Sequence, residues 1–142
     1  MARLTSPHLI DKSAIARRFT SPAVREQIEP LVVRGDAVTC GICDLELLYS
    51  ARSPSEYHAT AKALRQLKRL PVTEAAVDRA LEVQAALAER SQHRGVPLPD
   101  LLIAAVAELG GATVLHYDAD FDRIAEVTGQ PTRWIVPRGS VA

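Results

Sequence analysis

The chain has 142 residues, a mass of 15.4 kDa and 47% hydrophobic residues, so it can build one folded domain with a real core. Seventeen basic residues balance 17 acidic ones, so the net charge gives no sign of a strongly basic nucleic-acid-binding surface. Aromatic residues make up only 4%, which argues against an exposed stacking platform for single-stranded RNA.

The first half of the chain alternates short apolar segments with segments of helical spacing. Residues 9–10 predict a strand that ends at Asp11, and residues 14–19 continue at helical spacing. A second helix is expected from Pro22, with Ser21 as its cap, to a stop at Gly35. The following segments predict a strand at 37–40, a helix at 42–49, a helix from 54 to about 70 and a brief extended piece at 70–72.

The second half continues the same alternation. Thr73 caps a predicted long helix that runs towards Arg90, and residues 95–99 form a loop. Residues 101–109 are apolar on nearly all sides, which predicts a buried central helix. A strand at 113–116, a loop at 117–120, a helix at 121–127 and a strand at 133–136 follow. This order predicts an α/β fold, a small and mostly parallel sheet flanked by helices, over residues 1–137, with 138–142 as a loose tail.

Apolar runs and cysteines indicate the compartment. The longest apolar stretches, such as residues 101–107, are too short to cross a membrane, and residues 1–8 lack the apolar run of a secretory signal. Cys40 and Cys43 cannot make a disulfide framework, which fits a reducing environment. We therefore expect a cytoplasmic protein without a membrane partner.

Five acidic side chains are expected to meet at one end of the sheet. Asp11, Asp118 and Asp120 come just after predicted strands, Glu46 lies one turn into the helix after the second strand, and Asp100 opens the most apolar helix. In an open parallel sheet the site lies outside the carboxyl ends of the strands. Taken singly, these acids have simpler explanations. Asp118 or Asp100 can be a helix cap, and Asp120 can be the N-cap of the 121–127 helix. Asp44, two residues away, could take the place of Glu46 in the site.

Carboxylates gathered so closely raise one another's pKa unless a cation compensates them. Mg²⁺ prefers oxygen ligands and can activate water for attack on a phosphodiester. If five acids surround metal ions, 12 acidic residues remain to face 17 basic ones, which leaves a modestly basic exterior. The acids therefore predict a metal-dependent nuclease.

Four segments in this order resemble the PIN-domain ribonucleases, and within them the VapC toxins of bacterial toxin–antitoxin pairs. They span positions 9 to 121, nearly the whole chain, and the first and third are the most specific. They read Leu9-Ile10-Asp11-Lys12-Ser13-Ala14; Thr39 with Glu46-Leu47-Leu48-Tyr49-Ser50-Ala51; Pro99-Asp100-Leu101-Leu102-Ile103-Ala104-Ala105; and His116-Tyr117-Asp118-Ala119-Asp120-Phe121.

The resemblance implies a PIN-like three-layer α/β sandwich and Mg²⁺-dependent endonucleolytic cleavage of RNA, with Mn²⁺ as a substitute. It also implies a homodimer, a structured tRNA or rRNA target, and a cognate antitoxin whose C-terminal segment covers the active site. Asp11 and Asp100 would be the principal metal ligands. Glu46 and Asp118 would complete the pocket, with Asp118 also at the metal, Asp120 more peripheral, and Ser13 orienting a ligand or water.

Two positions depart from the family pattern. Many relatives have Thr where His116 stands and Thr where Lys12 stands. Neither change removes a carboxylate. The sequence does not reveal whether His116 and Lys12 make special contacts to RNA at the edge of the pocket.

Several alternatives compete with this interpretation. Cys40-Gly41-Ile42-Cys43 has the CxxC spacing of thiol-disulfide redox proteins, but the pair lacks a preceding Trp and would leave the acids unexplained. A zinc site needs a second close pair of ligands, and the four histidines are scattered. A catalytically silent PIN-fold binding module and phosphotransfer at Asp118-Ala119-Asp120 are the other candidates. No glycine-rich phosphate loop supports nucleotide binding.

Overall fold

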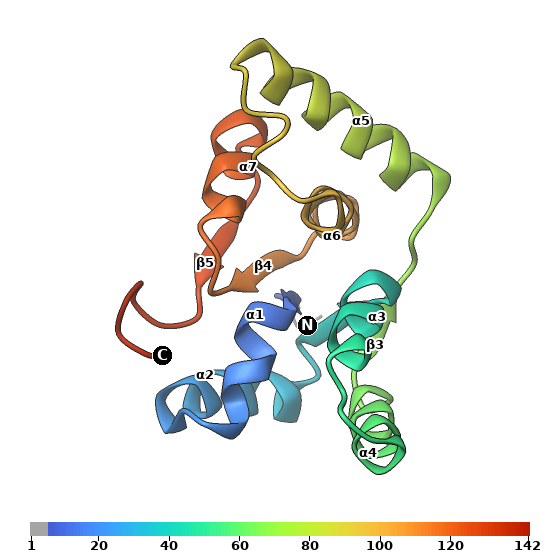
Figure 1. Ribbon diagram of the computed structural model, residues 1–142, viewed down its shortest axis with the longest axis vertical. Helices are drawn as coiled ribbons and strands as arrows, with labels where there is room; N and C mark the ends of the chain where they lie inside the picture. The colour runs from blue at the N-terminus through green and yellow to red at the C-terminus, as the bar shows by residue number, and fades with distance from the viewer. Residues whose placement is uncertain (1–5) are drawn as a thin grey trace, which may run out of the picture.

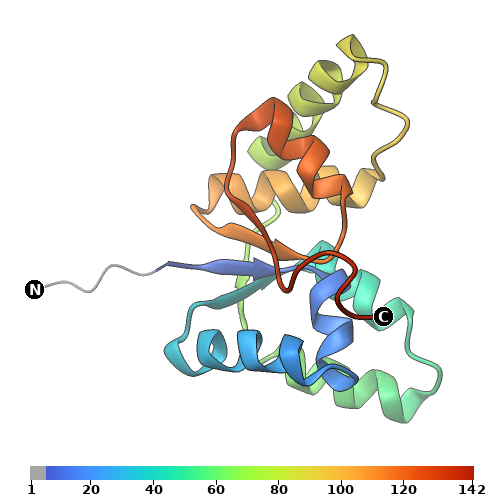
Figure 2. The ribbon, with the colours of Figure 1, turned by 90° about the vertical axis from the view of Figure 1, so that its left-hand side faces the viewer.

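A parallel sheet runs through the middle of the computed structural model, which describes residues 6–142 (Figures 1 and 2). In these residues it has five strands in the order β3-β2-β1-β4-β5, and each neighbouring pair is parallel. The strands are β1 (His8–Ile10), β2 (Ala37–Cys40), β3 (Lys68–Leu70), β4 (Thr113–His116) and β5 (Thr132–Trp134). The predicted α/β fold with a small parallel sheet is therefore confirmed.

Helices cover both faces of this sheet and make the three layers visible in Figure 2. One face carries α5 (Glu74–Glu89), α6 (Leu98–Leu109) and α7 (Asp120–Thr128). The other carries α1 (Lys12–Ile15), the 3₁₀ helix η1 (Ala16–Phe19), α2 (Pro22–Arg34) and α4 (Pro54–Leu64). Helix α3 (Gly41–Tyr49) contributes side chains to both cores.

Alternation along the central strands divides the core into two clusters. Leu9 and Val114 are buried against α5 and α6, whereas their neighbours Ile10 and Leu115 are buried against α1 and α2. Successive side chains of a strand point to opposite faces, so two apolar residues in a row supply both layers. Short apolar strands covered on both faces are what a parallel sheet requires.

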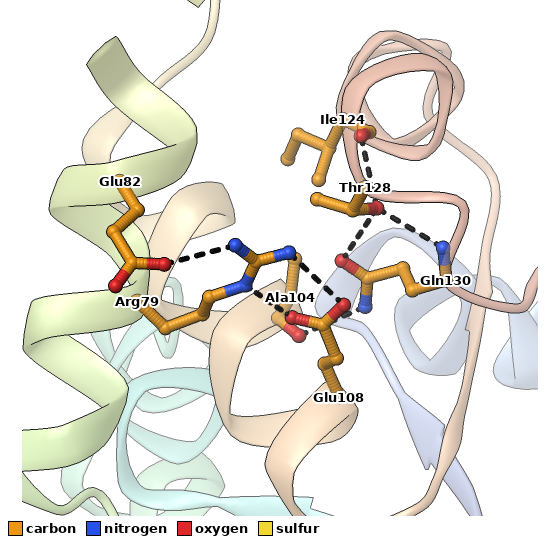
Figure 3. A network of polar contacts seen from close by, with 7 residues as sticks. All are labelled: Arg79, Glu82, Ala104, Glu108, Ile124, Thr128 and Gln130. Carbon is orange, nitrogen blue, oxygen red and sulfur yellow. Dashed lines mark hydrogen bonds and ion pairs between the residues drawn. The ribbon is translucent and has the colours of Figure 1, made fainter. Parts of the chain in front are cut away.

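Helix α6 is fixed from two sides by polar contacts (Figure 3). Arg79 of α5 donates from Nε to Glu108 Oε1 over 2.6 Å and from Nη2 to Oε2 over 3.3 Å. On the other side, Gln130 Nε2 donates to the carbonyl oxygen of Ala104 over 2.9 Å. Because Gln130 is also joined to Thr128 at the end of α7, these bonds link α6 to α5 and α7. They hold the helix whose first turn carries Asp100.

Several element boundaries differ from the sequence prediction, and three of these differences bear on the sheet or on the acidic residues. Helix α4 ends at Leu64 instead of about residue 70, and residues 68–70 form β3 along the edge of β2. Helix α6 starts at Leu98, so Asp100 lies within its first turn. Strand β5 covers 132–134 instead of 133–136, although Ile135 and Val136 are buried beyond it. Residues 68–70 form a strand because they pair with β2, and prolines at the start of α6 allow it to begin before Asp100. The spacing of apolar residues does not reveal either effect.

Residues 138–142, for which the sequence predicts a loose tail, contact the rest of the domain (Figure 2). Tyr117 donates its hydroxyl proton to the carbonyl of Val141 over 3.0 Å and accepts from the N–H of Gly139 over 2.8 Å. Arg17 Nε donates to the carbonyl of Ala142 over 2.9 Å. The domain boundary at residue 137 stays a prediction.

Among residues 6–142, no helix has both the length and the apolar character needed to cross a bilayer. The expected absence of a secretory signal concerns residues 1–8, of which residues 1–5 lie outside the described part of the chain.

Candidate metal centre

The structure brings the five predicted acids into two overlapping groups at the carboxyl end of the sheet. Asp11, Glu46 and Asp100 each offer one carboxylate oxygen within 4.8 Å of the others, and so do Asp100, Asp118 and Asp120. Asp100 belongs to both groups. Residues from the end of β1, from α3, from α6 and from the segment after β4 therefore converge on one place, as the parallel topology predicts.

Asp11 has one oxygen held by the protein and one left over. It is the N-cap of α1, where its Oδ2 accepts hydrogen bonds from the main-chain N–H of Ser13 over 2.9 Å and from the Ser13 hydroxyl over 2.6 Å. Its Oδ1 is buried and has no hydrogen-bond partner within residues 6–142. Burial raises the pKa of Asp11, although the Ser13 bonds pull it down.

Asp100 is buried in the first turn of α6 and shows the same pattern. Its Oδ2 has no hydrogen-bond partner in the described part of the chain. Burial, followed by the charges of Asp11, Asp118, Asp120 and Glu46, raises the pKa of Asp100 to about 8. Since an unpaired buried carboxylate is costly, a cation at this place would relieve both the burial and the repulsion.

The remaining acids line the edge of this centre. Glu46 lies 3.7 Å from the ammonium group of Lys12, and burial raises the pKa of Glu46 while Lys12 lowers it. Asp118 Oδ1 accepts from the N–H of Asp120 over 2.9 Å. Burial, assisted by Asp118, raises the pKa of Asp120. Asp120 is the first residue of α7 and not its N-cap, which is Ala119, and the Asp120 N–H is bound by the Asp118 carboxylate.

Asp44, the rival of Glu46, has a different role. Its Oδ1 accepts from the hydroxyl of Thr39 over 2.7 Å, and its Oδ2 accepts from Arg69 Nη2 over 2.7 Å and Nε over 3.1 Å. Residues two apart on a helix point in nearly opposite directions. The buried Asp44 is therefore engaged in an ion pair with the exposed Arg69 of β3, whereas Glu46 belongs to the acidic group.

The structure shows the contacts of His116, which the sequence does not predict. Its ring is buried, and its Nδ1 accepts from the main-chain N–H of Asp118 over 3.1 Å. Burial lowers the pKa of His116 to about 4, so the ring is neutral at physiological pH. Next to it, the N–H of Tyr117 donates to the hydroxyl of Ser13 over 2.9 Å. The segment that carries Asp118 is thus held by two side chains.

The CxxC pair lies in the core. Cys40 and Cys43 are free, buried thiols whose sulfur atoms are 3.7 Å apart, much longer than the disulfide length of about 2.05 Å. The hydrogen bond between the two thiols is the main cause that lowers the pKa of Cys40 to about 7. Thiol exchange needs an accessible sulfur, and these two have relative exposures of 0% and 4%. Their placement favours a packing role.

The ligand set fits a hard divalent cation. In residues 6–142 the two groups able to hold a metal ion consist of carboxylates, with no histidine or cysteine among them. Oxygen-only ligands suit Mg²⁺ or Mn²⁺ and not a structural zinc ion. The buried oxygens of Asp11 and Asp100 without partners mark where such an ion would bind.

Comparison with known proteins places the chain in a family. The model of the PIN domain family matches residues 9–127. Ribonuclease VapC51 of Mycobacterium tuberculosis is 49% identical over 134 residues, which cover 94% of this chain and 96% of that protein. Ribonuclease VapC21 of the same species is 48% identical over 139 residues, which cover 96% and 99%.

Solved structures share the fold at low sequence identity. The DNA-bound VapBC complex of Salmonella typhimurium contains a chain that matches with a TM-score of 0.77 at 19% identity, covering 93% of this chain and all of that one. A chain of VapBC-5 from Mycobacterium tuberculosis matches with a TM-score of 0.64 at 22% identity, covering 94% of this chain and all of that one. Together with the matched family model and relatives, the shared fold shows that this chain belongs to the PIN domain family, as a member of its VapC ribonucleases.

Proposed function

We propose that this protein is a divalent-cation-dependent endoribonuclease, with Mg²⁺ or Mn²⁺ as its cation, and that it acts as the toxin of a toxin–antitoxin pair. The observation that carries the proposal is the pair of buried carboxylate oxygens without partners, Asp11 Oδ1 and Asp100 Oδ2, inside a group of five acids. Relatives nearly half identical over almost their whole length are named ribonucleases, which supports the same chemistry here.

Each acidic residue has a part in this proposal. Asp11, Asp100 and Asp118 are the proposed cation ligands, and Glu46 and Asp120 complete the negative pocket. Asp100 is common to the two groups, with Asp11 and Glu46 in one and with Asp118 and Asp120 in the other. When bound, the ion supplies positive charge against the developing charge of the phosphodiester and lowers the pKa of a bound water. Ser13 holds Oδ2 of Asp11, which fixes the direction in which Oδ1 is presented. Lys12 lies beside Glu46 with a side chain 43% exposed, where it can meet an RNA phosphate.

We propose that the substrate is a structured RNA, either tRNA or rRNA. Its cleavage in the cytoplasm would stop translation, which accounts for the toxicity. The acids withdrawn into the pocket leave 12 acidic residues against 17 basic ones on the remainder of the chain, which favours a polyanionic substrate. Sequencing RNA ends after brief expression would identify the cleaved RNA and its site.

A groove beside the acidic centre is a suitable binding site for the antitoxin. An open groove of about 460 Å³ lies between η1, α3 and α4, and Leu47 at its wall directly follows Glu46. Phe19, at the same groove, is 68% exposed. VapBC-5 of Mycobacterium tuberculosis, a solved structure with this fold, is described as a member of the VapBC family of toxin–antitoxin systems, which supports an antitoxin partner for this chain. We propose that an apolar C-terminal antitoxin segment fills the groove and blocks the site, and that the toxin itself is a homodimer.

The nuclease is tested with purified protein and total RNA. The wild type with Mg²⁺ or Mn²⁺ should cleave, whereas the wild type with EDTA and the Asp100→Asn variant with metal should not. Equal cleavage in all three reactions would sink the proposal, because a contaminating or metal-independent nuclease would explain it. Intact RNA in all three, from a protein that folds and binds Mn²⁺, would favour the silent binding module instead.

A thiol-disulfide redox function is not favoured by the structure, since both sulfurs are buried in the core and thiol exchange needs an accessible sulfur. Cys40→Ala and Cys43→Ala variants with full RNA cleavage would dispose of it.

A further inference from the structure

The ring of His116 is held rigidly at the end of β4. It is fully buried and packs between the rings of Phe121 and Trp134, each with its centroid 5.1 Å away. The carbonyl oxygen of His116 accepts from the N–H of Ile135 over 2.7 Å. Both the main chain and the imidazole of this residue are therefore fixed by their neighbours.

The hydrogen bond from the Asp118 N–H defines the state of this ring. Because Nδ1 accepts that bond over 3.1 Å, it carries no proton, and the ring proton is therefore on Nε2. Within residues 6–142, the buried Nε2 has no hydrogen-bond partner. In the described part of the chain, the imidazole therefore makes one hydrogen bond, which it accepts from the main-chain N–H of Asp118.

This bond acts on a segment that enters the acidic centre. The preceding N–H, that of Tyr117, is held by the Ser13 hydroxyl over 2.9 Å. Asp118 Oδ1 is then engaged by the N–H of Asp120 over 2.9 Å, and the Asp118 carboxylate belongs to the group with Asp100 and Asp120. Two successive amides held by side chains from different elements fix the point from which the Asp118 carboxylate extends.

We infer that His116 is a positioning residue of the metal centre: through its unprotonated Nδ1 it holds the Asp118 amide and so places the Asp118 carboxylate for the cation. This inference rests on the proposed function, because it assigns a role at the same cation site. Groups that orient metal ligands without touching the metal affect metal affinity strongly.

Two variants separate the acceptor from the ring. His116→Phe keeps an aromatic ring against Phe121 and Trp134 but has no acceptor for the Asp118 N–H. His116→Asn loses the ring but offers a side-chain oxygen that can accept from the N–H two residues ahead, as in an Asx-turn. The measurements are Mn²⁺ binding to the RNA-free protein, followed by electron paramagnetic resonance, and the thermal unfolding midpoint.

His116→Phe should bind Mn²⁺ roughly tenfold or more weakly than the wild type while keeping a similar midpoint. His116→Asn should unfold at a lower temperature and yet retain most of the Mn²⁺ affinity. Wild-type affinity in the Phe variant would overturn the inference, and so would an Asn variant as weak as the Phe variant.

A measurement on the wild type keeps the test decisive if the Phe variant does not fold. The ¹⁵N spectrum of His116 should show the Nε2–H tautomer, and a proton on Nδ1 would overturn the inference. Failure of the proposed function is distinguishable: a wild type that neither binds Mn²⁺ nor cleaves RNA overturns both claims. A wild type that does both, with an unaffected Phe variant, overturns the role of His116 alone.

Discussion

The hydroxyl of Ser13 accepts a hydrogen bond from the main-chain N–H of Tyr117 over 2.9 Å, which ties the start of α1 to the segment after β4. The same hydroxyl donates to Asp11 Oδ2 over 2.6 Å. One small side chain therefore sets the position of an acid from one strand relative to the acids that follow another.

Replacing Ser13 with Ala removes this link. The Tyr117 N–H loses its acceptor and Asp11 Oδ2 loses its shortest partner, so Mn²⁺ affinity should fall by about 10- to 100-fold. Calorimetric titration of Mn²⁺ into the RNA-free protein measures this change. Ser13→Thr, which keeps a hydroxyl, is the matched control and should stay near the wild type. An Ala variant that binds Mn²⁺ as the wild type does would show that the link does not position Asp11.

The acids should differ in their importance for RNA cleavage. Asp11→Asn and Asp100→Asn remove buried carboxylates whose free oxygens face no protein partner within residues 6–142, so each should slow cleavage by on the order of 100-fold or more. Asp120→Asn should be milder, because Asp120 lies at the pocket edge and is more exposed. Single-turnover cleavage rates at saturating Mg²⁺ measure this order. Equal losses for all three variants would show that the division into central and peripheral acids is wrong.

Stability without a divalent cation should fall as pH rises. In the folded protein the pKa of Asp100 is raised to about 8 from an ordinary value of 3.8, so between these values the native state binds more protons than the unfolded chain. The stabilisation is complete below about pH 4 and is lost as pH approaches 8. The midpoint of Asp100→Asn should therefore rise relative to that of the wild type from pH 5 to pH 8 in EDTA. If the unfolding midpoints of the two proteins changed in parallel with pH, the raised pKa of Asp100 would be contradicted.

The contacts of the buried Asp44 with Thr39 and Arg69 should matter for stability and not for the cation. Asp44→Ala removes the short acceptor of the buried Thr39 hydroxyl, so the free energy of unfolding should fall by about 1–3 kcal/mol. The lost ion pair adds little to this change, because the Arg69 side chain is largely exposed to solvent. Urea denaturation measures the change. Mn²⁺ affinity should be unaltered, and a large loss of affinity would place Asp44 in the metal centre after all.

The sequence was informative where function and fold depend on local pattern. The apolar pair before Asp11 predicts both the strand and the acid at its end, and the all-round apolar segment predicts that α6 is buried with Asp100 at its start. Alternation of strands and helices then predicts a parallel sheet, which brings the strand ends together. The convergence of the five acids follows from this topology together with the positions of Glu46 and Asp100 on their helices.

What the sequence could not predict depends on partners distant in the chain. Residues 68–70 continue the helical pattern of α4, and they become a strand because the edge of β2 offers hydrogen bonds. The bond between His116 and the Asp118 amide depends on a ring held by Phe121 and Trp134. Helix phase could have separated Asp44 from Glu46, since residues two apart face opposite sides.

The position of the cation is the most direct test of the metal centre. Crystals of the protein grown or soaked with Mn²⁺ and measured near the manganese absorption edge would show the ion as an anomalous peak. The peak should lie at the Asp100 carboxylate, in the group with Asp11 and Glu46 or in the group with Asp118 and Asp120. It should be absent from crystals of Asp100→Asn treated in the same way. A peak elsewhere on the protein, or an unchanged peak in the variant, would contradict the assignment of this acidic group as the cation site.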